Sequence, residues 1–439
     1  MTDADILRIS GATAAEIADS IRALVERGAL APGDALPPVR TLAATLGVNR
    51  NTAVAAYRQL AAAGLVTSQG RAGTRIAGTP ATPQEGFAPS TELVDVGSAN
   101  PAPALLPRLE PALRALEPRP VLYGEAVIDA GLERWAREWL APDTPRDPRL
   151  TITNGSFDAV ERLLAQALTR DDAVALEDPC YLATIRTARL AGYRPLGVPV
   201  DAEGMTVEGL RAALAEGARA VVCTPRAQNP TGAGLTEARA TALREVLADH
   251  PYVLVIEDDH YSLLSRHPYR SMIAPDHRRW ALVRSVSKFL GPDMSLAVVA
   301  SDPHTADRLA QRLSPGTTWV SHLLQRLAHA LLSDPDTRAS IDRAGAHYAA
   351  RNAAFADRLG SRGLAVAPGD GLSLWIPVHD PAREVAARLR TRGWLVRPGD
   401  EFSIDAAAPS HHLRVTAHHL DDAAQERLAA DVAASARGA

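Results

Sequence analysis

From residue 93 to residue 439, short apolar segments alternate with amphipathic helical stretches, and this alternation limits the fold more than any other feature. Such apolar segments fit strands that are covered on both faces, and the helical stretches between them supply that cover. The pattern therefore predicts a largely parallel α/β sheet with helices on both faces. From about residue 335 it becomes α+β, which predicts a smaller C-terminal subdomain. The strand candidates are residues 174–176, 220–223, 253–256, 280–283 and 296–300.

The first 77 residues follow a different plan, because their apolar residues recur at helical spacing in three short stretches. Glycine or proline residues separate these stretches, and Asn49 is suited to cap the third helix. Two short strands around a glycine-containing turn complete a three-helix domain with a wing. The expected helices and strands are residues 13–28, 38–46, 50–63, 65–68 and 74–76.

Residues 78–92 separate the two patterns. Prolines and glycines break every helical or strand period there, so this segment is predicted to be a semi-rigid linker. The predicted domains are a winged helix-turn-helix over residues 1–77 and, after the linker, an α/β domain over residues 93–439. A chain of 439 residues has room for two or three domains.

The composition indicates the cellular compartment in which such a chain is expected. With 46% hydrophobic and 22% charged residues, it has the composition of an ordinary globular protein. Its two cysteines, Cys180 and Cys223, have no CxxC spacing, so neither a disulfide framework nor a zinc site is expected. No apolar run approaches the length of a membrane span, and the chain does not open with a leader-like segment. We therefore expect a cytoplasmic protein that does not contact a membrane.

Positive charge is concentrated near the N-terminus, although the whole chain has a net charge of −4. Residues 35–84 contain five arginines and no acidic residue. This cluster is typical of a nucleic-acid contact, and its plainer alternative is a solvated basic face. In a helix-turn-helix, the recognition helix enters the major groove with its first residues. The predicted contacts with double-stranded DNA are Asn49, Arg50, Asn51 and Thr52 in the groove, with Arg40 and Arg71 on the backbone or in the minor groove.

Lys288 is the only lysine of the chain, against 46 arginines. An arginine supplies positive charge, but it cannot lose its proton and attack a carbonyl, whereas a lysine amine can. A single lysine therefore suggests a covalent imine with an aldehyde cofactor, pyridoxal phosphate (PLP). The plainer alternative is one leftover surface lysine in an arginine-rich chain.

Residues at other strand ends match the rest of a PLP site. Asp258 and Tyr261 follow an apolar strand, at the place where open α/β sheets bind ligands. An acid there keeps the pyridine nitrogen protonated, and Tyr261 can reach the phenolic oxygen of the ring. Asn229 follows another strand and can donate a hydrogen bond to the same oxygen. Each residue has a plainer alternative, such as a loop cap or a turn, but their joint occurrence at strand ends predicts the site.

The phosphate of PLP needs a cup of its own. A helix that begins at residues 154–157 offers free amide groups and a helix dipole, and both favour an anion. Tyr181 is expected to stack on the ring, and His260 is expected to support the site from behind. The residues expected to line the cup are Gly155, Ser156, Phe157, Ser285 and Ser287.

The N-terminal segment resembles a GntR-type winged helix, in the order Leu36-Pro37-Pro38-Val39-Arg40, Val48-Asn49-Arg50-Asn51-Thr52, Tyr57-Arg58-Gln59-Leu60, Gly64-Leu65-Val66 and Gly70-Arg71-Ala72-Gly73-Thr74. A small helical cap on an enzyme is the alternative. Residues 93–439 resemble fold-type I aminotransferases. As a whole, the chain resembles the MocR subfamily of GntR regulators, and within it the PtsJ-like branch.

The resemblance implies roles for single residues. Lys288 would hold PLP, while Asp258, Tyr261 and Asn229 would contact its ring. Arg414, in Leu413-Arg414-Val415, would receive a ligand carboxylate. Tyr123 would reach the phosphate held by the partner subunit, which implies a homodimer.

Two positions depart from the family pattern. Ser295 stands seven residues after the lysine, where the pattern has a phosphate-binding arginine. The clamp then loses a bidentate charge, so either PLP binds more weakly or another arginine substitutes. Val54 stands where some GntR readers carry an arginine, which removes one DNA contact.

These observations predict a PLP-dependent transcriptional regulator. Its winged helix would bind operator DNA, and its aminotransferase-like domain would sense PLP, an amine or an amino acid. The alternative is an active PLP-dependent aminotransferase with an attached DNA-binding domain, although we expect little or no transaminase turnover. A third alternative is a DNA-binding protein whose large domain is only a dimer scaffold, with Lys288 idle.

Overall fold

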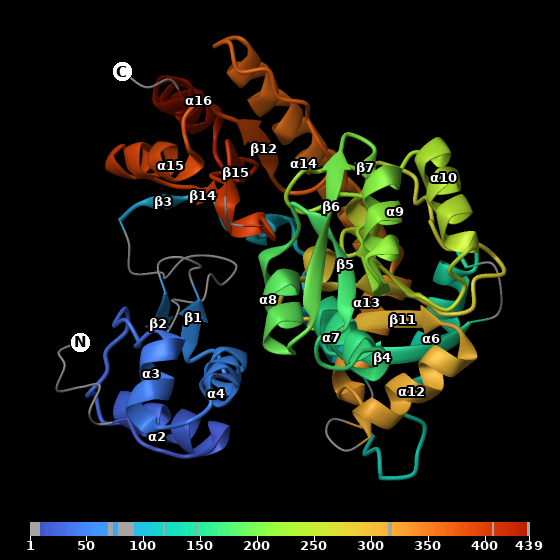
Figure 1. The fold of residues 1–439 in the computed structure, drawn as a ribbon. Helices are drawn as coiled ribbons and strands as arrows, with labels where there is room; N and C mark the ends of the chain where they lie inside the picture. Colours follow the sequence, from blue (N-terminus) through green and yellow to red (C-terminus); the bar gives the residue numbers. More distant parts are fainter. Residues whose placement is uncertain are drawn as a thin grey trace. The chain divides into compact units, whose positions relative to one another are not determined.

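The computed structural model describes residues 9–68, 73–77, 92–116, 119–144, 148–314, 318–405 and 408–436. The chain divides into two units, Met1–Pro83 and Gln84–Ala439 (Figure 1). The linker predicted over residues 78–92 falls almost entirely outside the described residues, so its bounds and the domain limits set by it stay predictions. Among the described helices, none is long and apolar enough to cross a membrane.

The described part of the N-terminal unit has three helices and a two-stranded ribbon, as predicted. A capping box between Thr13 and Glu16 begins the first helix, and Gly47, at φ 65°, ends the second. The Asn49 side chain begins the third by accepting a hydrogen bond from the amide of Asn51. The helices are α2 (Ala14–Glu26), α3 (Val39–Leu46) and α4 (Arg50–Ala62), and the antiparallel strands are β1 (Val66–Ser68) and β2 (Thr74–Ile76).

The core of this unit is made by aliphatic side chains from all three helices and the ribbon. Ile21, Leu42 and Leu60 are fully buried in it. Val54, which the helical periodicity places inward, is only half-buried. Alanines at the neighbouring positions 53 and 56 are buried instead, because the helices approach closely on that side of α4.

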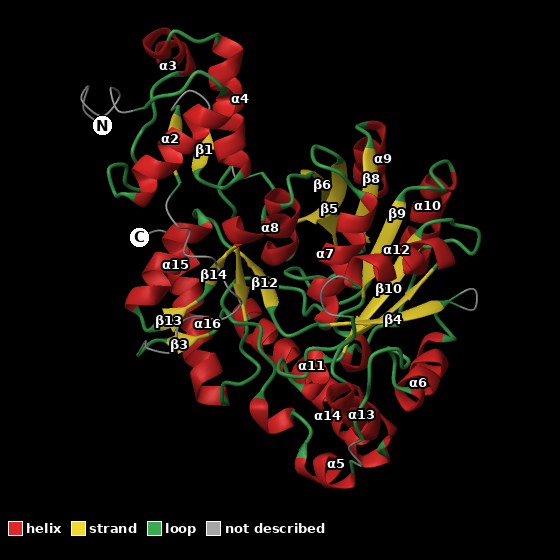
Figure 2. Ribbon diagram, turned by 90° about the horizontal axis from the view of Figure 1, so that it is seen from below, coloured by secondary structure: helices red, strands yellow, loops and turns green. Residues whose placement is uncertain are grey.

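An eight-stranded sheet organises the large unit, in the order β4-β11-β10-β9-β8-β5-β6-β7. Neighbouring strands from β10 to β6 are parallel (Figure 2). Strand β11 is antiparallel to both of its neighbours. The predicted strands are confirmed as β5 and β8 to β11. The bounds are β4 Arg149–Thr153, β5 Ala173–Asp178, β6 Arg194–Asp201, β7 Gly204–Met205, β8 Ala218–Cys223, β9 Leu254–Asp258, β10 Trp280–Ser285 and β11 Ala297–Ser301.

Helices cover both faces of this sheet, as the alternating pattern predicted. One hydrophobic core lies between the sheet and α7, α8 and α12, and another lies on the opposite face against α6, α9, α10, α13 and α14. The bounds are α6 Ala130–Leu140, α7 Gly155–Ala167, α8 Leu182–Leu190, α9 Val207–Ala215, α10 Glu237–Ala248, α12 Pro303–Leu313, α13 His322–Ser333 and α14 Pro335–Gly360.

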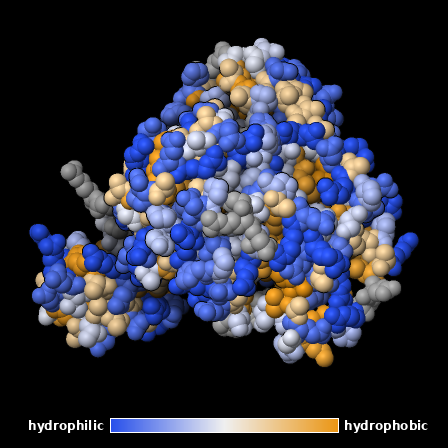
Figure 3. Space-filling model, turned by 90° about the vertical axis from the view of Figure 1, so that its right-hand side faces the viewer, coloured by the Kyte–Doolittle hydropathy of each residue, from blue (hydrophilic) through white to orange (hydrophobic). Residues whose placement is uncertain are grey.

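A third core in the large unit gathers its C-terminal elements. A three-stranded antiparallel sheet, β12-β15-β14, packs with α14, α15 and α16, and the short parallel pair β3 and β13 brings residues 94–96 to the same core. The bounds are β3 Val94–Asp95, β12 Leu374–Pro377, α15 Ala382–Thr391, β13 Trp394–Leu395, β14 Arg397–Pro398, β15 His412–Val415 and α16 Asp422–Ala436. Since most large apolar side chains lie in these cores, hydrophobic residues form only separate patches on the face shown in Figure 3.

Candidate functional site

A cavity of about 240 Å³ opens at the carboxyl ends of the parallel strands in the large unit. Side chains from five strand ends meet in its wall, after β4, β5, β8, β9 and β10. Open α/β sheets bind their ligands at this edge. The predicted site residues in the wall are Gly155, Ser156, Phe157, Tyr181, Asn229, Asp258, Ser285, Ser287 and Lys288.

A smaller pocket of about 30 Å³ adjoins this cavity and shares Asn229, His260 and Lys288 with it. Tyr261, which is 2% exposed, lines the smaller pocket. The Lys288 amine lies at the junction and donates a hydrogen bond to the carbonyl oxygen of Ala99, with an N–O distance of 3.0 Å. Lys288 and Tyr261 therefore line the same smaller pocket, together with Ala99.

The carboxyl group of Asp258 is ready to receive a donor from the cavity. Its Oδ1 atom is buried and has no hydrogen-bond partner among the described residues. Burial, and then the negative charge of Asp259, raise the pKa of Asp258 to about 7, while the Ser156 side chain opposes this through a hydrogen bond. A protonated pyridine nitrogen would supply both a donor and a positive charge, so this end of the cavity fits the ring of PLP.

Another part of the cavity wall has the properties of an anion cup. Gly155 begins α7 at φ 85°, and the first residues of this helix, whose amide groups have no partner within the helix, line the cavity. The Ser285 hydroxyl hydrogen-bonds to the Ser287 hydroxyl at 3.1 Å. Ser295 closes the rim of the cup and donates a hydrogen bond to the carbonyl oxygen of Asn154. Amides, hydroxyls and a helix dipole fit a phosphate group.

Arg414 lies next to the cavity, although it does not line either pocket. It is fully buried in β15 and donates hydrogen bonds to the side-chain oxygen of Asn229, at 3.1 Å, and to the carbonyl oxygen of Gly97. Because the oxygen of the Asn229 amide accepts from Arg414, its NH₂ group is directed away and can donate to a ligand oxygen. Arg414 therefore orients Asn229.

Tyr123 is the predicted site residue that lies away from the cavity of its own subunit. Its side chain is 92% exposed, and its ring packs against that of Trp319 with a centroid distance of 5.5 Å. Because Tyr123 lies on the surface, its predicted contact with the phosphate would have to be made in a second subunit. That contact stays a proposal.

Glu177 and His260 are wall residues whose place was not predicted, or was predicted differently. Glu177, at the end of β5, accepts hydrogen bonds from the Thr224 amide and the Gln228 side chain, and burial raises its pKa to about 7. His260 was expected behind the site but lines both pockets. Burial, and then the charge of Lys288, lower the pKa of His260 to about 4, so its imidazole is neutral at pH 7.

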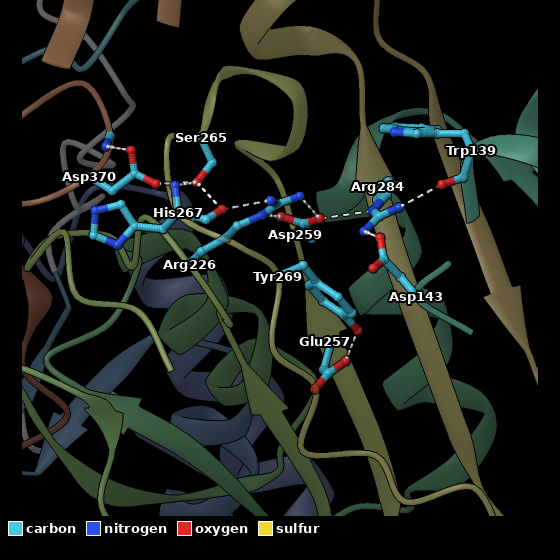
Figure 4. Close-up of polar contacts among 11 residues, drawn as sticks. Trp139, Asp143, Arg226, Glu257, Asp259, Ser265, His267, Tyr269, Arg284 and Asp370 are labelled. Carbon is cyan, nitrogen blue, oxygen red and sulfur yellow. Dashed lines mark hydrogen bonds and ion pairs between the residues drawn. The ribbon is translucent and has the colours of Figure 1, made fainter. Parts of the chain in front are cut away.

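A buried ionic network lies next to these strand ends (Figure 4). Asp259 is fully buried between two arginines and binds Arg226 through both carboxylate oxygens, at 2.8 Å each, and Arg284 at 2.8 Å. Arg284 continues to Asp143, just after α6, and both guanidinium groups lie over the ring of Tyr269. The network therefore ties together the ends of β8, β9 and β10, which carry Asn229, Asp258 and Lys288.

The predicted DNA-contacting residues of the N-terminal unit lie at the beginning of α3 and α4. The side chains of Arg40, Asn49, Arg50 and Asn51 are exposed, and that of Thr52 is half-buried. Arg71 lies outside the described residues. The four residues predicted to enter the major groove therefore lie together at the beginning of α4. Their contacts with DNA stay predictions.

Comparison with known families divides the chain in the same way. Residues 13–76 match the family of bacterial regulatory proteins of the gntR type, and residues 114–432 match the aminotransferase class I and II family. The chain is 47% identical over 425 residues to the vitamin B6 salvage pathway transcriptional repressor PtsJ of Salmonella typhimurium, covering 97% of this chain and 98% of that protein. The chain belongs to the MocR subfamily of GntR regulators.

Other relatives support this MocR assignment. The pyridoxine biosynthesis transcriptional regulator PdxR of Corynebacterium glutamicum is 27% identical over 370 residues, which is 79% of this chain and 78% of that protein. Among solved structures, the α-aminoadipate aminotransferase LysN of Thermus thermophilus superposes with a TM-score of 0.70 at 22% identity, over 79% of this chain and 92% of that one. That similarity confirms the fold-type I aminotransferase fold.

Because Glu257 is a buried acid, the free energy of unfolding of this MocR chain is expected to depend on pH. Burial raises its pKa from 4.5 to about 7, although it accepts hydrogen bonds from Tyr269, Ser271 and the Met272 amide. The folded state therefore keeps this proton while the unfolded chain loses it. The destabilising contribution of Glu257 develops between about pH 4.5 and 7 and is complete above that range.

We expect Glu257→Gln to remove this contribution. In the variant without cofactor, the free energy of unfolding should fall less between pH 4.5 and 7 than in the parent, because the amide does not titrate and the two hydroxyl groups can turn to accept its hydrogens. Urea unfolding at several pH values measures the slope. Glu245→Gln, on the exposed face of α10, controls for the loss of a carboxylate. Equal slopes for parent and Glu257→Gln would contradict the assignment.

Proposed function

We propose that this MocR regulator binds PLP on Lys288 and adjusts its binding to operator DNA, in the cytoplasm, according to a ligand of that site. The observation that carries the proposal is the cavity whose wall combines Lys288, the carboxyl group of Asp258 with its unpartnered oxygen and the first residues of α7. The relatives PtsJ and PdxR are transcriptional regulators of vitamin B6 salvage and of pyridoxine biosynthesis, and this supports the proposal.

Each wall residue would have a separate part in holding the cofactor. When bound, PLP supplies an aldehyde that condenses with a primary amine and a ring that withdraws electrons. Asp258 would accept a hydrogen bond from the pyridine nitrogen, and Tyr181 would cover the ring. Asn229, oriented by Arg414, and Tyr261 would donate to the phenolic oxygen. The cup residues would hold the phosphate, namely Gly155, Ser156, Phe157, Ser285 and Ser287.

Arg414 is also the residue that would receive the carboxylate of an amino-acid effector. Its guanidinium hydrogen-bonds to Asn229, which lines the smaller pocket beside Lys288. An amino acid bound near Lys288 would therefore bring its carboxylate close to Arg414. A transaminase with a DNA-binding appendage would use the same contacts. The close match with a transcriptional repressor over nearly the whole chain favours the regulator.

The large unit would act as a homodimer. Its exposed apolar side chains include Leu122 at 68%, Tyr123 at 92% and Leu323 at 55% exposure, on two segments joined by the hydrogen bond from Arg326 to the carbonyl oxygen of Arg119. Such a patch on a surface marks an association site. A second copy would bury it and bring Tyr123 to the phosphate of the partner subunit.

The DNA proposal assigns base contacts to Asn49, Arg50, Asn51 and Thr52, and phosphate contacts to Arg40 and Arg71. Arginine binds the guanine edge through two hydrogen bonds, so Arg50 should carry much of the sequence preference. We expect Arg50→Ala to weaken binding to the operator by about 1–3 kcal/mol and to leave binding to unrelated duplex less affected. Titration of both duplexes by fluorescence anisotropy, at several salt concentrations, gives the two free energies.

Arg58→Ala is the matched control, because it removes the same charge from an exposed position two turns further along α4. It should change the affinities for operator and unrelated duplex equally. If Arg50→Ala also weakened both equally, Arg50 would contact phosphate and the assignment of its base contact would be wrong. Absence of any duplex binding at moderate salt would contradict the regulator itself.

A further inference from the structure

The anion cup contains no arginine among its described lining residues, although the chain has 46 of them. Its polar groups are the first amides of α7 and the hydroxyl groups of Ser285, Ser287 and Ser295. Lys288 is the one lysine or arginine in the described wall, and its amine is directed to the carbonyl of Ala99 on the other side. The phosphate end of the cavity is therefore built from neutral donors alone.

Ser295 occupies the position from which a positive charge would reach the cup. Its hydroxyl oxygen lies 3.3 Å from the point where a Cβ atom on Gly155 would stand, and it hydrogen-bonds to the carbonyl of Asn154. It thus borders the first residue of α7, next to the free amides. Its side chain is exposed and lines the cavity, so a longer side chain has room to extend over the cup.

Neutral donors hold a phosphate dianion more weakly than a guanidinium group does, since charge-assisted hydrogen bonds are about twice as strong as neutral ones. We propose that Ser295 keeps the affinity for PLP low, so that the fraction of chains with PLP on Lys288 follows the free PLP concentration. PLP is then the effector that the regulator senses, rather than a permanently bound group. This inference rests on the function proposed above and specifies its ligand.

The test measures how much the phosphate contributes to binding, separately from the ring and the aldehyde. Pyridoxal has the same ring and aldehyde as PLP but no phosphate, so the ratio of their dissociation constants measures what the cup contributes. We expect Ser295→Arg to raise this ratio by about 10- to 100-fold in favour of PLP. Absorbance titrations of the full-length chain with each aldehyde give both constants. Ser295→Gln, which lengthens the side chain with an uncharged hydrogen-bond donor, should change the ratio by less than about threefold.

A second measurement tests the effector role. The PLP concentration that half-changes operator binding should fall in Ser295→Arg by the same factor as the PLP dissociation constant. An unchanged ratio in Ser295→Arg would overturn the proposed role of Ser295. A tighter constant with an unchanged midpoint would overturn PLP as the effector. If the wild-type chain bound neither aldehyde, the proposed function would fail first, and this inference with it.

Discussion

Borohydride reduction of the PLP-loaded chain should place all stable label on the peptide that contains Ser287-Lys288-Phe289. Lys288 is the only lysine, so the α-amino group of the chain is the only other primary amine of the polypeptide that could compete. The lysine amine lies at the junction of the two pockets, in the cavity proposed to hold the ring and phosphate. Peptide mapping by mass spectrometry after reduction gives a single expected site.

Lys288→Arg is the decisive variant, because it keeps the positive charge but cannot form an imine at ordinary pH. Labelling should be lost completely, while the midpoint of thermal unfolding stays close to that of the parent without cofactor. The longer guanidinium group can still reach the carbonyl of Ala99, so the fold should tolerate it. Label on the N-terminus, or equal labelling of the variant, would contradict the assignment of PLP to Lys288 and leave only the proposed DNA-binding function.

The sequence predicted those elements whose residues are apolar without interruption. Strands β5 and β8 to β11 were found in this way, whereas β4 and β6 were missed. Strand β4 begins with exposed and half-buried residues at one edge of the sheet, and β6 contains Pro195 and Pro199, which a strand pattern excludes. The antiparallel direction of β11 was also not predicted, because hydrophobic periodicity carries no information on strand direction.

Site residues were predicted where a chemical group follows a strand end, and missed where the partner comes from a distant segment. The contact between Arg414 and Asn229 joins residues 185 positions apart, and the pairing of β3 with β13 brings the segment at residue 95 to a C-terminal core. No local pattern encodes either contact. One signal was available for the buried network: Arg284 directly follows the apolar segment 280–283 within the same buried strand, so it needed a counter-charge, and Asp259 was a candidate at a neighbouring strand end.

We expect Asp259→Asn to lower the free energy of unfolding by about 3–5 kcal/mol, the range for breaking one side of a buried ion pair. The variant leaves Arg226 and Arg284 facing each other across a neutral amide, whose single oxygen can accept at most two of their three hydrogen bonds and whose NH₂ group can accept none. Burial alone would raise the pKa of Asp259, but Arg226 and Arg284 outweigh it and hold the pKa below its usual range. Urea denaturation at pH 7 measures the loss.

Asp143→Asn is the matched control at the outer end of the same network. Its carboxylate is 27% exposed, and Arg284 keeps Asp259 as a partner when that charge is removed, so we expect a loss below about 2 kcal/mol. The two variants also differ in pH dependence. Since the pKa of Asp259 is depressed in the folded state, its contribution is complete above the unfolded value and is lost as the pH falls, and Asp259→Asn should lack this acid-side loss.

The consequence for PLP binding follows from what the network connects. Asp259 is adjacent to Asp258, while Arg226 and Arg284 precede Asn229 and Lys288 by three and four residues. If the network positions these three strand ends, Asp259→Asn should weaken PLP binding even without urea, where the variant is still folded. Asp143→Asn should bind PLP as the parent does. A variant that lost several kcal/mol of stability yet kept the parent affinity for PLP would show that the network supports the fold alone and does not position the site.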